Sequence, residues 1–197
     1  MFSTHTCRVQ TFARPSAPYC CHRRRARGRR QNGAMPQATA SSGAGVSARH
    51  WVRAAWNLVN LSTPLGLLVA AAGRSSLRWG PELLLVAEGY RLPLPRAGAF
   101  TVGNVVLVPR ALLAGVEATQ PGTVDHEARH SSQYAWFLGL PFLPCYAAAS
   151  GWSWLRTGDP WSRNWFERDA GLARGGYAEH PADNAGLRQL GRWLRLN

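Results

Sequence analysis

Two histidines four residues apart, with a glutamate directly after the first, constrain the middle of this chain more than any other feature. They form the pattern H-E-x-x-H at His126, Glu127 and His130. On an α-helix, residues i and i+4 lie one above the other on the same face, so both imidazoles can bind one ion. Glu127 then stands close to the ion without having to bind it, where a general base takes a proton from a zinc-activated water. The pattern predicts a helix here and a Zn²⁺ site on it.

A third ligand is needed, because a catalytic zinc has three protein ligands and one open position. Residues 164–171 are amphipathic enough to form a second helix, and Glu167 begins an E-x-x-A group within them. This arrangement resembles the gluzincin class of zinc metallopeptidases, in which a Glu on a later helix completes H-E-x-x-H. The resemblance covers residues 124–134 and 164–173. It implies that His126, His130 and Glu167 are ligands and that Glu127 is the catalytic base.

The chain departs from that class at two positions. Many members have Asp where this chain has Gly171, so Asp169 is the candidate to supply the missing carboxylate. Arg129 places a charge inside the motif, where Asp125 could neutralise it or it could hold a substrate carboxylate. The combination H-E-x-R-H-S-x-Q, W-S-W-L and N-x-F-E-R is also similar to small bacterial membrane-associated proteins of no known substrate.

Three further polar residues are candidates for supporting roles. Gln133 lies one turn beyond His130 on the same face and could orient a ligand or the substrate, or make an ordinary polar contact. Asn164 lies one turn before Glu167 and could fix its carboxylate. Tyr146 could hydrogen-bond a transition-state oxyanion, although a lone Tyr is more often structural.

The net charge of +13 is mostly a property of the N-terminus. Residues 1–34 hold eight of the 23 basic residues and no acidic residue. We expect residues 1–50 to be a disordered basic tail, with Met35 as an alternative start that would make 1–34 a start-site artefact. The Arg run at 22–30 could bind nucleic acid or anionic lipid, but no recognised binding fold follows it, so nucleic acid is a disfavoured partner.

Two long stretches without charge lie at 54–73 and 135–155. The first has the length of a bilayer span but a polar first half, so it is a membrane-spanning or interfacial helix, or else a buried core helix. The second contains two Gly and two Pro and cannot be one straight helix. It is either a kinked or re-entrant membrane hairpin or a Trp-rich loop and helix beneath the metal site. We expect membrane association on the cytoplasmic side of a bacterial inner membrane, or a cytoplasmic protein if both stretches are core.

Other patterns fill in the fold. Residues 99–108 are β-prone, with Gly103-Asn104 as a two-residue hairpin turn. Thr123 could cap the motif helix. Residues 184–196 are amphipathic and would lie on an anionic membrane or cap the domain's own core. The four cysteines form no C-x-x-C pair, which disfavours a cysteine zinc site. We therefore predict a mainly helical α+β fold over 51–197: one zincin-like domain with a pair of metal-binding helices and a small β-hairpin.

The function favoured by these patterns is that of a membrane-associated zinc metallopeptidase, or another hydrolase with the same site, acting on a peptide or protein. Membrane lipid is the second expected partner. The alternative is a non-catalytic membrane protein that keeps the metal, or only the polar helix pair, for structure.

Overall fold

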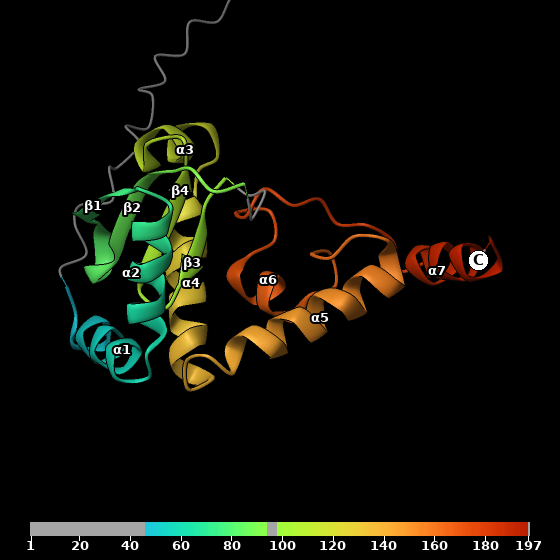
Figure 1. The fold of residues 1–197 in the computed structure, drawn as a ribbon, viewed down its shortest axis with the longest axis horizontal. Coiled ribbons are helices and arrows are strands. Elements are labelled where there is room, and N and C mark those ends of the chain that lie inside the picture. The colour runs from blue at the N-terminus through green and yellow to red at the C-terminus, as the bar shows by residue number, and fades with distance from the viewer. Residues whose placement is uncertain (1–45, 94–97, 197) are drawn as a thin grey trace, which may run out of the picture. The chain divides into compact units, whose positions relative to one another are not determined.

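The computed structural model describes residues 46–93 and 98–196. They form a mixed α+β fold that is mainly helical, as predicted (Figure 1). The predicted tail lies outside the described residues except for its last five, and Ala48–His50 are already helical. The helices are α1 (Ala48–Val59), α2 (Ser62–Ala72), η1 (a 3-10 turn, Pro81–Leu83), α3 (Leu113–Thr119), α4 (Thr123–Trp136), α5 (Phe142–Thr157), α6 (Trp165–Ala170) and α7 (Ala185–Leu196). The strands are β1 (Ser76–Trp79), β2 (Leu85–Tyr90), β3 (Phe100–Val102) and β4 (Val105–Pro109).

The sheet has the strand order β1-β2-β4-β3, so β3 forms one edge of it. Strands β2 and β4 run parallel, and the other two pairs are antiparallel. The predicted hairpin is confirmed: Val102 pairs with Val105 across a two-residue turn. Gly103 has φ 62, and a Cβ there would lie 2.4 Å from the backbone of α2, so only glycine fits.

The sheet lies between α2 and α4 (Figure 1). Successive residues of β4 point to opposite faces. Val105 and Leu107 pack in the cluster that contains Ala70 of α2, and Val106 and Val108 in the cluster that contains Ala128 of α4. This packing fixes α4, and with it the H-E-x-x-H motif, beside the edge strand β3.

The first uncharged stretch is divided into two helices. The chain turns at Leu61, which has φ 68, and α1 and α2 are bent by 75° relative to each other. In the part of the chain that the structure describes, no single helix has both the length and the apolar character to cross a bilayer. The bent pair α1 and α2 satisfies length and composition only when taken together.

The second uncharged stretch is a turn followed by a helix. Helix α4 ends at Trp136, and the chain turns through Leu138 and Gly139, which have φ 58 and 89. Helix α5 then continues through Gly151 without a break. Pro144 lies in its first turn, where a missing N–H costs little. Phe142 packs against Tyr134 of α4 and Phe166 of α6, and this contact links the three helices that surround the site.

Candidate metal centre

The start of α4 is fixed by a carboxylate from the preceding helix. Thr123 is not the cap: it is the first residue of α4, and the cap position is Gly122, with φ 92. The Glu117 carboxylate accepts hydrogen bonds from the backbone N–H groups of Gly122 (2.7 Å) and Val124 (2.9 Å). A negative group at this position satisfies free N–H groups and complements the positive end of the helix dipole.

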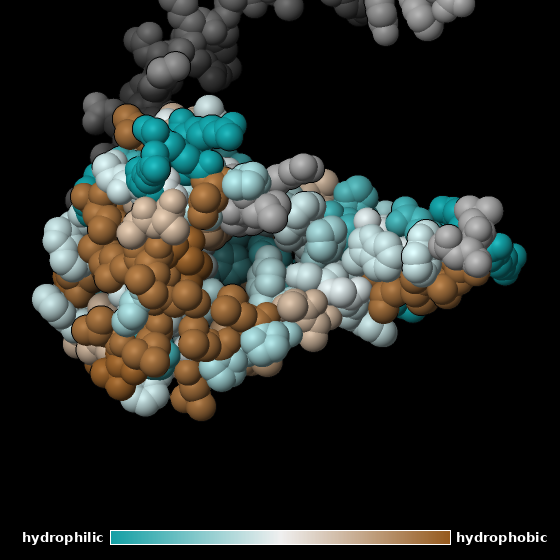
Figure 2. Space-filling view, in the orientation of Figure 1, coloured by the Kyte–Doolittle hydropathy of each residue, from teal (hydrophilic) through white to brown (hydrophobic). Residues whose placement is uncertain are grey.

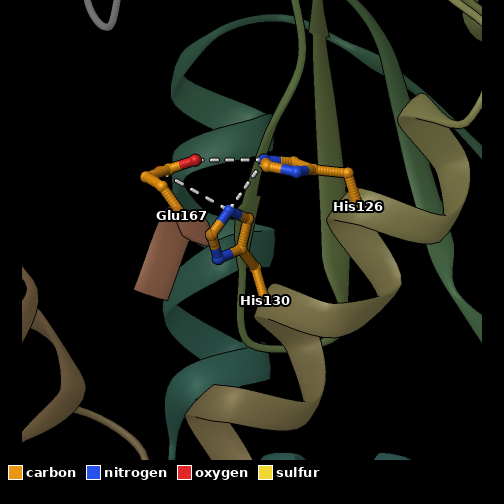
Figure 3. Close-up of side chains that lie close together, drawn as sticks. All are labelled: His126, His130 and Glu167. Carbon is orange, nitrogen blue, oxygen red and sulfur yellow. Dashed lines mark hydrogen bonds and ion pairs between the residues drawn. The ribbon is translucent and has the colours of Figure 1, made fainter. Parts of the chain in front are cut away.

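Three side chains from two helices point toward one another: His126 and His130 from α4, and Glu167 from α6 (Figure 3). All three side chains are buried. The two Nε2 atoms are 3.0 Å apart, and Glu167 places one carboxylate oxygen 3.2 Å from His126 Nε2 and the other 3.6 Å from His130 Nε2. The structure therefore brings together the three predicted ligands.

These separations fit a metal ion of zinc's size. Ligand atoms about 2.0–2.1 Å from a tetrahedral zinc lie roughly 3.3 Å from one another. The three observed separations, 3.0, 3.2 and 3.6 Å, lie around that value. Glu167 Oε2 also makes no hydrogen bond within the described structure despite its burial, as expected of an oxygen whose natural partner is a cation.

The outer nitrogen of each imidazole faces an oxygen. His126 Nδ1 lies 3.2 Å from the Gly171 carbonyl, and His130 Nδ1 lies 2.8 Å from Gln133 Oε1. Because these oxygens only accept, each Nδ1 carries the proton, and each Nε2 presents its lone pair to the space between the ligands. This is the tautomer that a metal requires.

A chain of contacts behind His130 holds Gln133 in this orientation. Gln133 Nε2 donates to the Phe166 carbonyl (2.9 Å) and to the Asp169 carboxylate (2.8 Å). Asp169 is in turn held by two hydrogen bonds from Arg129, of 2.7 and 2.8 Å. Asp169 thus supplies a supporting carboxylate, and Arg129 connects α4 to α6.

Two predicted roles need correction. Arg129 is paired with Asp169 and not with Asp125, which lies 4.0 Å from Arg174 instead. Asn164 does not fix the Glu167 carboxylate: its oxygen caps α6 by accepting from Phe166 N–H, and its amide donates to Ser150 on α5.

Glu127 is held by the edge strand. Its carboxylate Oε2 accepts a hydrogen bond of 2.7 Å from the hydroxyl of Thr101 on β3. Both side chains are buried, and both line the cavity that contains the three ligands. This hydrogen bond fixes one oxygen of the Glu127 carboxylate and leaves the other to accept a proton.

The cavity has a volume of about 340 Å³ and is bounded by β3, the start of α5 and the segment after α6. Figure 2 shows a hollow between the sheet edge and α5, with hydrophilic residues at its floor. Tyr146 of α5 donates its hydroxyl hydrogen to Glu167 Oε1, so it orients a ligand in this structure rather than facing an open position. The apolar wall of the cavity includes Phe100, Phe142 and Leu143.

The segment after α6 closes the site on the side of His126. Tyr177 stacks on Trp161 with ring centroids 4.8 Å apart, and both rings line the cavity. A Cβ at Gly175 would lie 2.8 Å from His126 Nε2, so this backbone passes directly over the ligand atom. Burial raises the pKa of the Tyr177 hydroxyl, which therefore stays protonated as a possible hydrogen-bond donor.

Comparisons of the chain with family models, curated proteins and solved structures found no match. The assignment of the site therefore rests on its own geometry and charge.

The charges of the site favour a cation at its centre. Burial raises the pKa of Glu127, which the neighbouring imidazoles offset only in part. Burial would also raise the pKa of Glu167, but its interactions with the neighbouring imidazoles of His126 and His130 outweigh burial and lower that pKa to about 2. For His130, burial lowers the pKa, yet the two glutamates outweigh burial and raise it. The two buried carboxylates, Glu127 and Glu167, thus both stabilise a positive charge between the ligands, either a proton or a metal ion.

Sequence analysis missed Thr101, Glu117 and Tyr177. None of them has a signature of its own, because their roles depend on which strand lies beside α4 and on the path of the chain after α6. Only the β-prone character of residues 99–108 hinted that Thr101 lies near the motif.

Proposed function

We propose that this protein is a zinc-dependent hydrolase of zincin-like design, with a peptide or protein as substrate. The observation that carries the proposal is the geometry of His126, His130 and Glu167, whose donor atoms are spaced for a tetrahedral zinc and lie beside a buried glutamate. Helices α4 and α6 would be the metal-binding pair, and the cavity would hold the fourth, open position.

A zinc ion bound there would supply Lewis acidity, which lowers the pKa of a water to about 7 and polarises a carbonyl. Glu127 would take the proton from that water and later give one to the leaving group. Its raised pKa makes it a stronger base than a solvated glutamate, and Thr101 keeps one carboxylate oxygen in place. Tyr177 lines the same cavity with a protonated hydroxyl and is the candidate donor to the developing oxyanion.

The lining of the cavity favours a neutral, apolar group next to the bond that is cleaved. Among the described residues, the only ionisable side chains of histidine, arginine, aspartate or glutamate that line the cavity are the three proposed ligands and Glu127. The other lining side chains are aromatic or aliphatic, except Thr101. Away from the metal site and Glu127, a charged substrate group would lose its hydration without gaining an opposite charge from the lining. Residues 99–102 form part of the wall and include the edge strand β3, to which an extended peptide could add.

We also propose that the protein works at a membrane, on the cytoplasmic side. The support is the number of exposed apolar side chains on α1, α2 and the α4–α5 turn. Figure 2 shows hydrophobic residues gathered over these helices. Exposed members include Trp51, Val52, Val59, Leu61, Leu68, Trp136, Leu138 and Leu143. Apolar patches of this extent on a protein surface usually contact lipid or another protein.

The competing function is a non-catalytic membrane protein in which the three-residue cluster is structural. One observation favours it: the ligands already contact one another, and Tyr146 bonds to Glu167. A structural role does not explain a base in a cavity next to the ligands.

Substitution of Glu127 separates the two functions. Glu127→Gln preserves size and the Thr101 contact but cannot accept a proton, so the variant should keep close to one zinc per chain. It should cleave neutral peptides with large apolar residues about 10²–10⁴-fold more slowly than the parent. His130→Ala should lose the zinc, and Glu179→Gln, which changes an exposed carboxylate, serves as the matched control. Equal cleavage by the parent and Glu127→Gln would rule out the proposed chemistry.

A further inference from the structure

Helix α7 (Ala185–Leu196) separates apolar and basic residues onto different sides. Leu187, Leu190 and Leu194 are spaced three and four residues apart, so they share one face. Arg188, Arg192 and Arg195 are spaced four and three residues apart and share another face. The helix contains no acidic residue.

The leucine face takes no part in the core clusters of the described residues. Leu187, Leu190 and Leu194 are 46%, 37% and 62% exposed. Figure 2 shows the same division, with a hydrophobic strip along one side of α7 and hydrophilic residues along another. The sequence also allowed α7 to cap the domain's own core, but within the described residues the three leucines are exposed and lie outside the core clusters.

The attachment of α7 lies at its N-terminal end. Asn184 N–H donates to the Arg156 carbonyl at the end of α5 (2.7 Å). Gly186 is buried against the Trp154 backbone, where a Cβ would lie 2.0 Å from the carbonyl oxygen. The helix is therefore held at one end, and the rest of its leucine face is open to a partner.

We propose that α7 is an amphipathic membrane-binding helix, which inserts its leucine face into the interface of a bilayer that contains anionic lipid. The apolar residues would enter the boundary between headgroups and acyl chains, while Arg192 and Arg195 contact lipid phosphates. Arg188 is paired with Asp183 in the fold. Trp193, which is 61% exposed, would lie at headgroup depth, where Trp is enriched. A second copy fits less well, because pairing through this face would bring two rows of arginine close together. The proposal does not depend on whether the metal site binds zinc.

The test is flotation of the full chain with vesicles of phosphatidylcholine, with or without phosphatidylglycerol. Leu194→Asp should lower the partition coefficient on the mixed vesicles at least about tenfold, because it replaces a leucine that would insert into the membrane with a charged side chain. Gln189→Asp adds the same charge at an exposed position outside the leucine face and is the matched control. It should bind several-fold better than Leu194→Asp. Both variants retain the basic N-terminal residues, so a contribution from them is equal in the two.

A second comparison tests the charge requirement. Replacement of Arg192 and Arg195 by Gln should weaken binding to the phosphatidylglycerol vesicles by about fivefold per arginine. It should change binding to pure phosphatidylcholine little. All variants should keep the melting temperature and zinc content of the parent, because these side chains are exposed.

Equal vesicle binding by Leu194→Asp and Gln189→Asp would overturn the proposal. So would unchanged vesicle binding combined with loss of self-association by Leu194→Asp in sedimentation, which would make a second copy the occupant of this face.

Discussion

The proposed ligand His130 depends on Gln133, whose side-chain oxygen fixes the imidazole tautomer and whose nitrogen is fixed by Asp169. Removing such an outer partner of a metal ligand typically weakens metal binding 10–100-fold. We predict a loss of that size in zinc affinity for Gln133→Ala, and a loss in the same direction for Asp169→Asn, both measured by competition with a chromophoric chelator. Asp183→Asn is the control, because Asp183 also pairs with an arginine but lies away from the site. Equal affinities in all three variants would show that the network does not support the metal.

The grouping of the three candidate ligands could be predicted from the sequence, because the spacing of the residues indicates it. His126 and His130 are one helical turn apart, and a carboxylate on a second helix was the natural third donor. The direction of Arg129 could not be predicted, because an i−4 partner on its own helix and a distant partner on α6 are equally compatible with the sequence. The structure selects Asp169, with which Arg129 makes two hydrogen bonds.

At the scale of elements, strand β2 is tied to its neighbours by one buried carboxylate. Glu88 accepts hydrogen bonds of 2.8 Å from Arg78 on β1 and from Leu113 N–H at the start of α3. The hydrogen bond from Arg78 is the main reason that the pKa of Glu88 is lowered, against the opposing effect of burial. Because the folded state holds this carboxylate ionised, its stabilising effect is present above the unfolded pKa and is lost as pH falls through the folded pKa.

We therefore predict that Glu88→Gln lowers the free energy of unfolding by roughly 1–3 kcal/mol at pH 7. The difference from the parent should shrink as the pH falls below about 4.5, since the parent's carboxyl group also becomes neutral. Urea unfolding at several pH values measures both effects. A difference that stays constant down to pH 3 would contradict the role of ionised Glu88.

Element boundaries followed the sequence where a turn has its own chemistry and failed where tertiary contacts decide. The Gly103-Asn104 turn and the break near Gly139 were predictable. The division of residues 54–73 at Leu61 was not, because Leu has no preference for a positive φ and the bend is imposed by packing of α2 on the sheet. The cap of α4 was also misplaced, since Glu117 acts across a turn from another helix.

At the scale of the whole molecule, metal binding should be linked to proton release. Without metal, the pKa of His130 is raised by Glu167 and Glu127 in spite of burial, so the two glutamates favour the protonated imidazole. Zinc needs the neutral imidazole and must displace this proton. Zinc affinity should therefore fall about tenfold per pH unit below the pKa of His130, and level off above it.

Calorimetry in buffers of different ionisation enthalpy should find that zinc binding releases a proton at pH values below the pKa of His130, and that the release diminishes above it. In Glu127→Gln, one of the two carboxylates that raise the pKa of His130 is gone, so the affinity should level off at a lower pH than in the parent. A zinc affinity that is independent of pH between 5 and 8 would contradict this linkage.

The most direct test of the central claim is the zinc K-edge X-ray absorption spectrum of the purified, zinc-loaded protein. We predict two imidazole nitrogens at about 2.0–2.1 Å and further oxygen ligands at about 2.0–2.2 Å, and the loss of this two-imidazole signature in His126→Ala. A sulfur ligand at about 2.3 Å, or a spectrum unchanged by His126→Ala, would show that the metal is not held by His126, His130 and Glu167.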